Sequence, residues 1–96
     1  MIFMARIIEY ETKNLIGPIV RKTRLEKHMS QQELSARLET MAIYICRGSI
    51  SRIEDQSRTV TDIELYGLSK ILNIPLEKFF IEINEDSLNF DSKSLV

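Results

Sequence analysis

Apolar residues recur at helical spacing through the middle of the chain, beginning near residue 14. Ile16, Val20 and Thr23 fall on one face of a helix that we expect to start at residue 14 or 17 and to end at residue 28. Pro18 suits the first turn of this helix, where the missing N–H of proline leaves no helical hydrogen bond unmade. The pattern therefore predicts a first helix with one inner face.

A second helix is predicted after Ser30. Glu33 stands three residues later, which is the spacing of a helix-capping box. Leu34 and Leu38 follow at an interval of four residues and, with Ser35 beside them, give this helix an inner face. We expect it to end at residue 40 or 41.

Residues 46–55 form a third, shorter helical pattern with two different faces. Ile50 and Ile53 lie on one face. At about 100° per residue, an arc of about 140° on the other side holds only polar or small side chains. These residues are Arg47, Gly48, Ser51 and Arg52, and the acidic Asp55 also falls within this arc, at the end of the helix. Arginine can bind guanine through two hydrogen bonds, serine can contact a base or a phosphate, and glycine permits close approach.

The second and third helices together are typical of a helix-turn-helix, whose second helix enters the major groove of DNA. Gln31 and Gln32 occupy the first turn of the second helix. Side-chain amides and free backbone N–H groups at that position can contact a phosphate, so we expect both residues to bind DNA. The alternative is that the two glutamines only begin a helix.

A fourth helix is predicted after Thr61, because Glu64 completes a second capping box. Asn73 suits the position that follows a helix end. Leucines at helical spacing form its inner face. They are Leu65, Leu68 and Leu72.

A short fifth helix, PLEKFF, is predicted to open at Pro75. We expect its Leu76, Phe79 and Phe80 to close the core or to contribute to a dimer contact.

The two ends of the chain have a different character. Residues 1–13 show no regular period and fit a short strand, a frayed helix or an arm that reaches a partner. Apolar and polar residues alternate over 81–84, which is typical of a strand, and one arrangement pairs them with part of MARIIEY in a small sheet. The sequence therefore predicts an N-terminal extension over 1–13, a domain over 14–80, and a partly mobile, acidic C-terminal extension over 81–96.

Composition fits a small soluble protein. The 96 residues suffice for one domain, and 44% of them are hydrophobic. No apolar run approaches the roughly 18 residues of a membrane span, and the first ten residues do not have the pattern of a signal peptide. We expect a cytoplasmic protein that does not bind a membrane.

The net charge of −1 is unusual for a protein that binds nucleic acid, but the charges are unevenly distributed. Residues 21–58 carry eight basic and five acidic side chains, whereas the remaining segments carry five basic and nine acidic. A phosphate backbone responds to a local basic face, so this distribution is compatible with DNA binding.

Catalytic and metal-binding patterns are missing from the sequence. It has one cysteine and one histidine, no glycine-rich phosphate loop, and no nucleophile with a base at a meaningful spacing. His28 falls at a helix end, where we expect a capping role. We therefore expect no catalytic residue, no metal and no cofactor.

Three blocks of the sequence resemble the phage-repressor-like (Cro/Xre-type) helix-turn-helix family. They are IGPIVRKTRLEKHMSQQELSARL, SISRIE and VTDIELYGLSKILNIPLEKFF, and they span about 14–80. The resemblance implies a compact, lambda-repressor-like bundle of five helices and a DNA-binding regulator that acts as a dimer. It further implies that Gln31 contacts a phosphate, that Arg58 touches the DNA backbone, and that Arg24 and Glu54 form a structural ion pair.

The chain departs from the family in three places. The connection LETMAIYICRGSI is longer than usual, as in a long-turn branch of the family, and it either extends the second helix or forms a loop with Ile43 and Ile45 inside and Tyr44 outside. Cys46 replaces a serine or threonine cap, and we expect it to be inert and partly buried. Gln56 replaces the usual glycine after the third helix, at a cost of roughly 1 kcal/mol if the left-handed conformation persists.

Two functions remain. The favoured one is a homodimeric, sequence-specific regulator of transcription, a repressor, that binds double-stranded DNA through residues 46–55. The alternative is a protein-interaction module or antitoxin-like protein that binds a partner through the long turn or the acidic tail.

Overall fold

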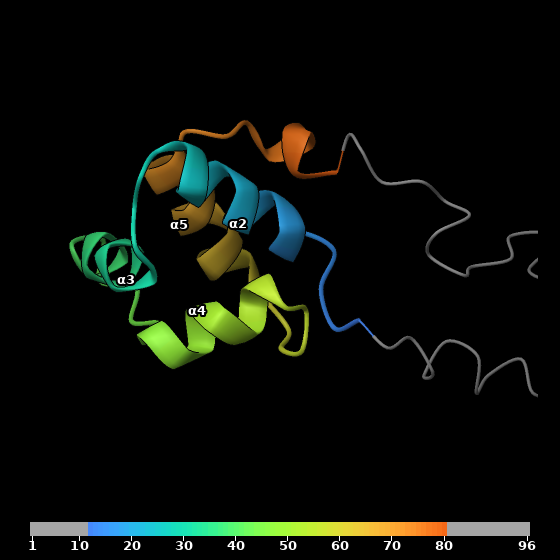
Figure 1. The fold of residues 1–96 in the computed structure, drawn as a ribbon, viewed down its shortest axis with the longest axis horizontal. Coiled ribbons are helices and arrows are strands. Elements are labelled where there is room, and N and C mark those ends of the chain that lie inside the picture. Colours follow the sequence, from blue (N-terminus) through green and yellow to red (C-terminus); the bar gives the residue numbers. More distant parts are fainter. Residues whose placement is uncertain (1–11, 81–96) are drawn as a thin grey trace, which may run out of the picture.

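The computed structural model describes residues 12–80, which form four α-helices and a 3₁₀ turn without a strand (Figure 1). The elements are α2 (Gly17–Glu26), α3 (Gln31–Glu39), α4 (Arg47–Glu54), α5 (Asp62–Leu72) and η1 (Leu76–Phe79). The expected all-α class is confirmed for these residues. The fifth expected helix is a 3₁₀ turn, and the proposed sheet between the two ends lies outside the described residues.

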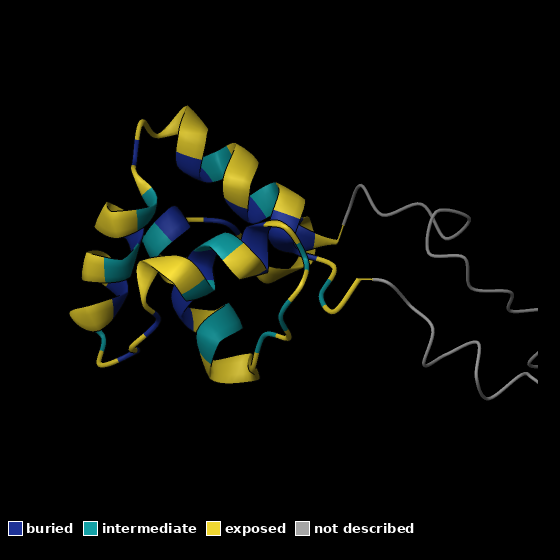
Figure 2. Ribbon diagram, turned by 60° about the horizontal axis from the view of Figure 1, so that its bottom comes forward, coloured by how far each residue is buried: buried dark blue, intermediate teal, exposed yellow. Residues whose placement is uncertain are grey.

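The helices α2 and α3 each pack against both α4 and α5. In Figure 1, α5 lies in the middle of the bundle with α2 above it, α3 at one end and α4 below. One side of α4 therefore faces away from the bundle, as the run of exposed residues at its start also shows (Figure 2).

One apolar core holds the helices together. The expected inner residues Val20, Leu34 and Leu38 are fully buried, whereas Thr23 and Leu65 are half-buried. Of the apolar residues expected near the end of the domain, Phe79 lies in the core, whereas Leu76 and Phe80 are 48% and 40% exposed. The buried apolar residues are Ile16, Val20, Met29, Leu34, Leu38, Ile43, Ile45, Ile50, Ile53, Leu68, Leu72, Ile74 and Phe79.

Both predicted capping boxes are present. The backbone N–H of Glu33 donates to Ser30 Oγ at 3.0 Å, and the Glu33 carboxylate accepts the N–H of Ser30 at 2.8 Å. Thr61 and Glu64 repeat the arrangement at the start of α5, at 3.2 and 3.0 Å. Each box satisfies backbone donors that the first helical turn would otherwise leave without a partner.

Asn14 determines where α2 begins. Its Oδ1 accepts the N–H of Gly17 at 2.8 Å, and its Nδ2 donates to the carbonyls of Ile53 and Arg58 at 3.0 and 2.8 Å. The helix therefore starts at Gly17, and Asn14 joins it to the end of α4. A Cβ at position 17 would collide with the carbonyl oxygen of Ile53, so the close approach of α2 to α4 requires glycine there.

The four α-helices within residues 12–80 end in the same way. Each is followed by a non-glycine residue with positive φ, and the next N–H donates to the carbonyl five residues back, as in a Schellman motif. The positive-φ residues are His28, Ala42, Gln56 and Asn73, with φ of 55°, 61°, 66° and 57°. The donated bonds run from Met29, Ile43, Ser57 and Ile74, at 3.0, 3.1, 2.9 and 2.9 Å.

These motifs decide the helix ends that sequence patterns left open. Because the chain reverses at His28 and Ala42, α2 ends at Glu26 and α3 at Glu39, each earlier than expected. The long connection is thus a loop. Asn73 follows the end of α5 as predicted, and the left-handed conformation that the sequence left open at Gln56 is present.

The substitution of alanine by glycine at two positions, 42 and 36, tests this left-handed geometry. Ala42 is exposed and left-handed, so Ala42→Gly should raise the free energy of unfolding by about 0.5–1 kcal/mol, since glycine adopts positive φ without strain. Ala36 is exposed within α3, so Ala36→Gly should lower the free energy of unfolding by about 1 kcal/mol. Urea unfolding of both variants measures the two effects, and a loss of stability in both would contradict the left-handed geometry.

Candidate nucleic-acid interface

The two faces of α4 differ as the sequence predicts. Ile50 and Ile53 are fully buried, while Arg47, Gly48 and Arg52 are exposed and Ser51 is half-buried. The structure thus brings the four predicted residues together on the outer side of one short helix. A helix of this kind can offer two guanidinium groups and a hydroxyl to a ligand without disturbing the core.

Ser49 supports Arg52 on this face. The Nη2 atom of Arg52 donates to Ser49 Oγ at 3.0 Å, and Cys46 Sγ lies 3.5 Å from the same oxygen. At about 100° per residue Ser49 falls beside Ile53 on the inner side of the helix, yet its side chain is half-buried and reaches the exposed arginine. Ser49 is therefore a supporting residue that helical periodicity missed.

A buried ion pair fixes the inner side of α4 to α2. Arg24 Nε and Nη2 donate to the two carboxylate oxygens of Glu54 at 2.6 and 3.0 Å, and both residues are 7% exposed. Arg24 Nη1 also donates to the carbonyl of Met29 at 2.7 Å. The ion pair that the family resemblance implied is thus present and closes the turn between α2 and α3 as well.

Gln31 is joined to the same ion pair. Its Nε2 donates to Glu54 Oε1 at 3.0 Å, and its side chain is half-buried, whereas Gln32 is exposed. One amide hydrogen of Gln31 is therefore used within the protein. The second amide hydrogen of Gln31, the exposed side-chain amide of Gln32 and the backbone N–H groups of these two residues are left for a phosphate.

Arg58, the other residue expected to touch DNA, is held by a carboxylate. Its Nη1 and Nη2 donate to Glu64 Oε1 and Oε2 at 2.9 and 2.8 Å, and Nη1 also reaches the carbonyl of Thr59 at 3.0 Å. The hydrogen bonds from Arg58 are the largest cause of a lowered pKa at Glu64. Arg58 thus braces the loop before α5, and a phosphate would have to compete with Glu64 for it.

The long connection is held against the bundle. Ile43 and Ile45 are 7% and 3% exposed, and Tyr44 between them is 75% exposed, as the sequence predicts for a loop. Ser35 Oγ donates to the carbonyl of Ile45 at 2.6 Å. Gly67 in α5 leaves the space that the Ile43 side chain fills.

The expectation that Cys46 is partly buried is wrong. Cys46 is the exposed N-cap of α4, and its side chain makes no capping hydrogen bond to the helix. Hydrogen bonding with the hydroxyl of Ser49 is the largest cause of a lowered pKa of the thiol. An exposed thiol with a lowered pKa reacts more readily with alkylating reagents near neutral pH.

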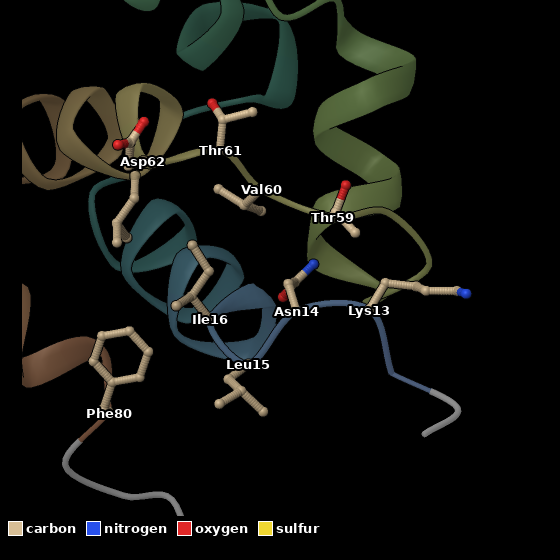
Figure 3. A pocket seen from close by; sticks show the side chains of 10 residues that line it. Lys13, Asn14, Leu15, Ile16, Thr59, Val60, Thr61, Asp62 and Phe80 are labelled. Carbon is tan, nitrogen blue, oxygen red and sulfur yellow. The ribbon is translucent and has the colours of Figure 1, made fainter. Parts of the chain in front are cut away.

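A second surface feature lies where the described chain begins and ends. An open groove of about 420 Å³ is lined by Lys13 and Leu15 from one end, by Val60 and Leu65, and by Phe80 from the other end (Figure 3). In Figure 3, the Phe80 ring and the Leu15 side chain lie on the same side of α2. This groove is mainly apolar and contains none of the predicted DNA-binding residues.

No protein-family model and no curated protein matches the sequence of this chain. Within residues 12–80, no helix is long and apolar enough to cross a membrane. The same residues contain no group of three or more His, Cys, Asp or Glu side chains that could hold a metal ion. The function of the α4 surface is therefore inferred from its own side chains.

The ion pair of Arg58 with Glu64 predicts a pH dependence of stability. The folded-state pKa of Glu64 is lowered from 4.5, so its contribution is complete above that value and is lost as the pH falls through the lowered pKa. At pH 7, Glu64→Gln should lower the free energy of unfolding by about 1 kcal/mol, and the difference from wild type should shrink in acid. Urea unfolding across pH measures this, with the exposed Glu77→Gln as control. A difference that is independent of pH would contradict the ion pair.

Alkylation tests the environment of Cys46. Because it is the only cysteine, iodoacetamide should modify this thiol alone, with an apparent pKa below 9.0. Ser49→Ala removes the hydroxyl that hydrogen-bonds the thiol, so this pKa should move back toward 9.0. The rate of modification, followed by mass spectrometry at a series of pH values, gives the apparent pKa of the thiol in the wild type and in the variant. Identical pKa values in the two proteins would show that Ser49 does not act on Cys46.

Proposed function

We propose that this protein is a sequence-specific DNA-binding regulator that inserts α4 into the major groove. The observation that carries this proposal is the division of α4 into a buried face, with Ile50 and Ile53, and an exposed face, with Arg47 and Arg52. Arginine is the residue that most often reads guanine in the major groove. Gly48 has no side chain and so permits close approach of the first turn of the helix to DNA.

The packing around α4 supports the same function. A helix that reads bases must be held in one orientation, and α4 is fixed by its buried isoleucines and by the Arg24–Glu54 ion pair. The helix α3 packs against α4, and its first turn carries Gln31 and Gln32. In a lambda-repressor-like helix-turn-helix, α3 would contact the phosphates that border the groove.

Binding as a homodimer follows from the small size of this reading surface. A single short helix covers few base pairs, and a symmetric dimer doubles the contacts on half-sites about one helical turn apart. Exposed apolar side chains such as Leu15 and Phe80, at 38% and 40% exposure, could form the contact between protomers. An occupied operator blocks transcription without any further domain, so repression is the simplest outcome.

A second candidate, a protein-interaction or antitoxin-like module, is favoured by one observation. Apolar residues at the start of α5 are exposed without being needed for DNA binding, namely Ile63 at 65% and Tyr66 at 52%. They offer a surface that a different protein could cover. The two candidates are compatible, because this surface and the exposed face of α4 do not share residues.

Selection of fragments from random double-stranded DNA, followed by affinity measurement, tests the proposal. The double variant Arg47→Ala/Arg52→Ala should raise the Kd for the selected sequence by at least about tenfold, since each lost bidentate contact costs about 1–3 kcal/mol. The control Arg21→Ala/Lys27→Ala removes the same charge from exposed positions in and just after α2. It should change the Kd by much less.

Two results would contradict DNA reading by α4. One is the absence of any selected sequence at low salt. The other is an equal loss of affinity in both double variants, which would indicate a general effect of charge.

A further inference from the structure

The connection between α3 and α4 presents one large side chain to solvent. Tyr44 is 75% exposed, although both of its neighbours in the chain are buried. Burial alternates from Ala42 to Cys46, with exposed residues at 42, 44 and 46. A period of two is typical of extended backbone, so Tyr44 and Cys46 project to the same side.

This tyrosine is held in place from both directions. On one side, the N–H of Ile43 donates to the carbonyl of Leu38 at 3.1 Å, and the Ile43 side chain packs at Gly67. On the other side, the carbonyl of Ile45 accepts a hydrogen bond from Ser35 at 2.6 Å. The connection is therefore anchored to α3 and α5, and Tyr44 has little freedom to turn inward.

The position of Tyr44 relates it to the exposed face of α4. It lies three residues before Arg47, and Cys46, which projects to the same side, is the N-cap of that helix. The charged residues that surround it in the sequence are mostly positive, since residues 37–52 contain three arginines and one glutamate. A large neutral hydrogen-bond donor in such a setting complements a polyanion better than it complements a basic or apolar protein surface.

We propose that Tyr44 packs against the sugar–phosphate backbone beside the groove that α4 enters and donates its hydroxyl hydrogen to a phosphate oxygen. Tyrosine is one of the side chains that make such contacts, and it loses little conformational entropy because it has only two side-chain torsions. The long connection is then a second part of the DNA interface. This inference rests on the proposed function, since it names a further contact of the same site.

The test uses the DNA sequence that the full-length protein selects. Tyr44→Phe should raise the Kd by about tenfold or more, the effect of one lost hydrogen bond to a charged group, and Tyr44→Ala should raise it further. The slope of log Kd against log salt should stay unchanged in both, because tyrosine is neutral, whereas Arg47→Ala should reduce it. Tyr66→Phe is the matched control, because it removes a hydroxyl from an exposed tyrosine in α5.

A cross-linking experiment identifies what Tyr44 touches. A photoreactive phenylalanine at position 44 should form an adduct with the selected DNA, and the same group at position 66 should not. Adducts from position 44 only with protein, or unchanged affinity of both Tyr44 variants for DNA that the parent binds, would overturn this contact alone. Failure of the parent to select any DNA would overturn the proposed function and this contact with it.

Discussion

The buried ion pair between Arg24 and Glu54 is the interaction on which the arrangement of the helices depends. The pair joins α2 to α4, and its Glu54 carboxylate accepts a hydrogen bond from Gln31 of α3. The third guanidinium nitrogen of Arg24 donates to the carbonyl of Met29 and so closes the turn between α2 and α3. Removal of one partner from such a pair leaves a buried charge without compensation and costs about 3–5 kcal/mol. The orientation of α4, and therefore the direction in which Arg47 and Arg52 project, is coupled to the stability of the whole bundle.

The same bundle accepts strain at its helix ends. A left-handed conformation costs a non-glycine residue about 1–2 kcal/mol, and it recurs after every described α-helix. In three of the four cases the residue that follows, Met29, Ile43 or Ile74, is buried in the core. Burial of a side chain of that size contributes about 1.5–3 kcal/mol, which offsets the strain. Tight helix ends are thus maintained by the apolar residue after the turn rather than by glycine.

Local signals made much of this fold predictable from the sequence. Ser30 and Thr61 predict where their helices start, because a capping box is complete within four residues. The inner leucines follow from helical spacing. The ends of α2 and α3 were predicted one or two residues too late, because helical spacing does not show that His28 and Ala42 adopt a left-handed conformation. The partners of Gln31 and Arg58 were missed for another reason. A polar side chain on a helix or loop surface has the same sequence pattern whether its partner is a phosphate or a carboxylate. Only the fold brings Glu54 to Gln31 and Glu64 to Arg58.

These internal partners change the kind of DNA binding that the proposed function implies. Two of the eight basic residues in 21–58, Arg24 and Arg58, are neutralised by carboxylates within the protein. Glu54 is already in the charge count of that segment, but Glu64 lies outside it, so the positive field around α4 is weaker than the excess of basic residues there indicates. The net charge of −1 adds no general attraction to DNA. A protein built in this way should bind random DNA weakly. Affinity for its target would then depend on directed contacts from a rigid surface, such as the two exposed arginines of α4 and the tyrosine of the long connection, and on their repetition in a dimer.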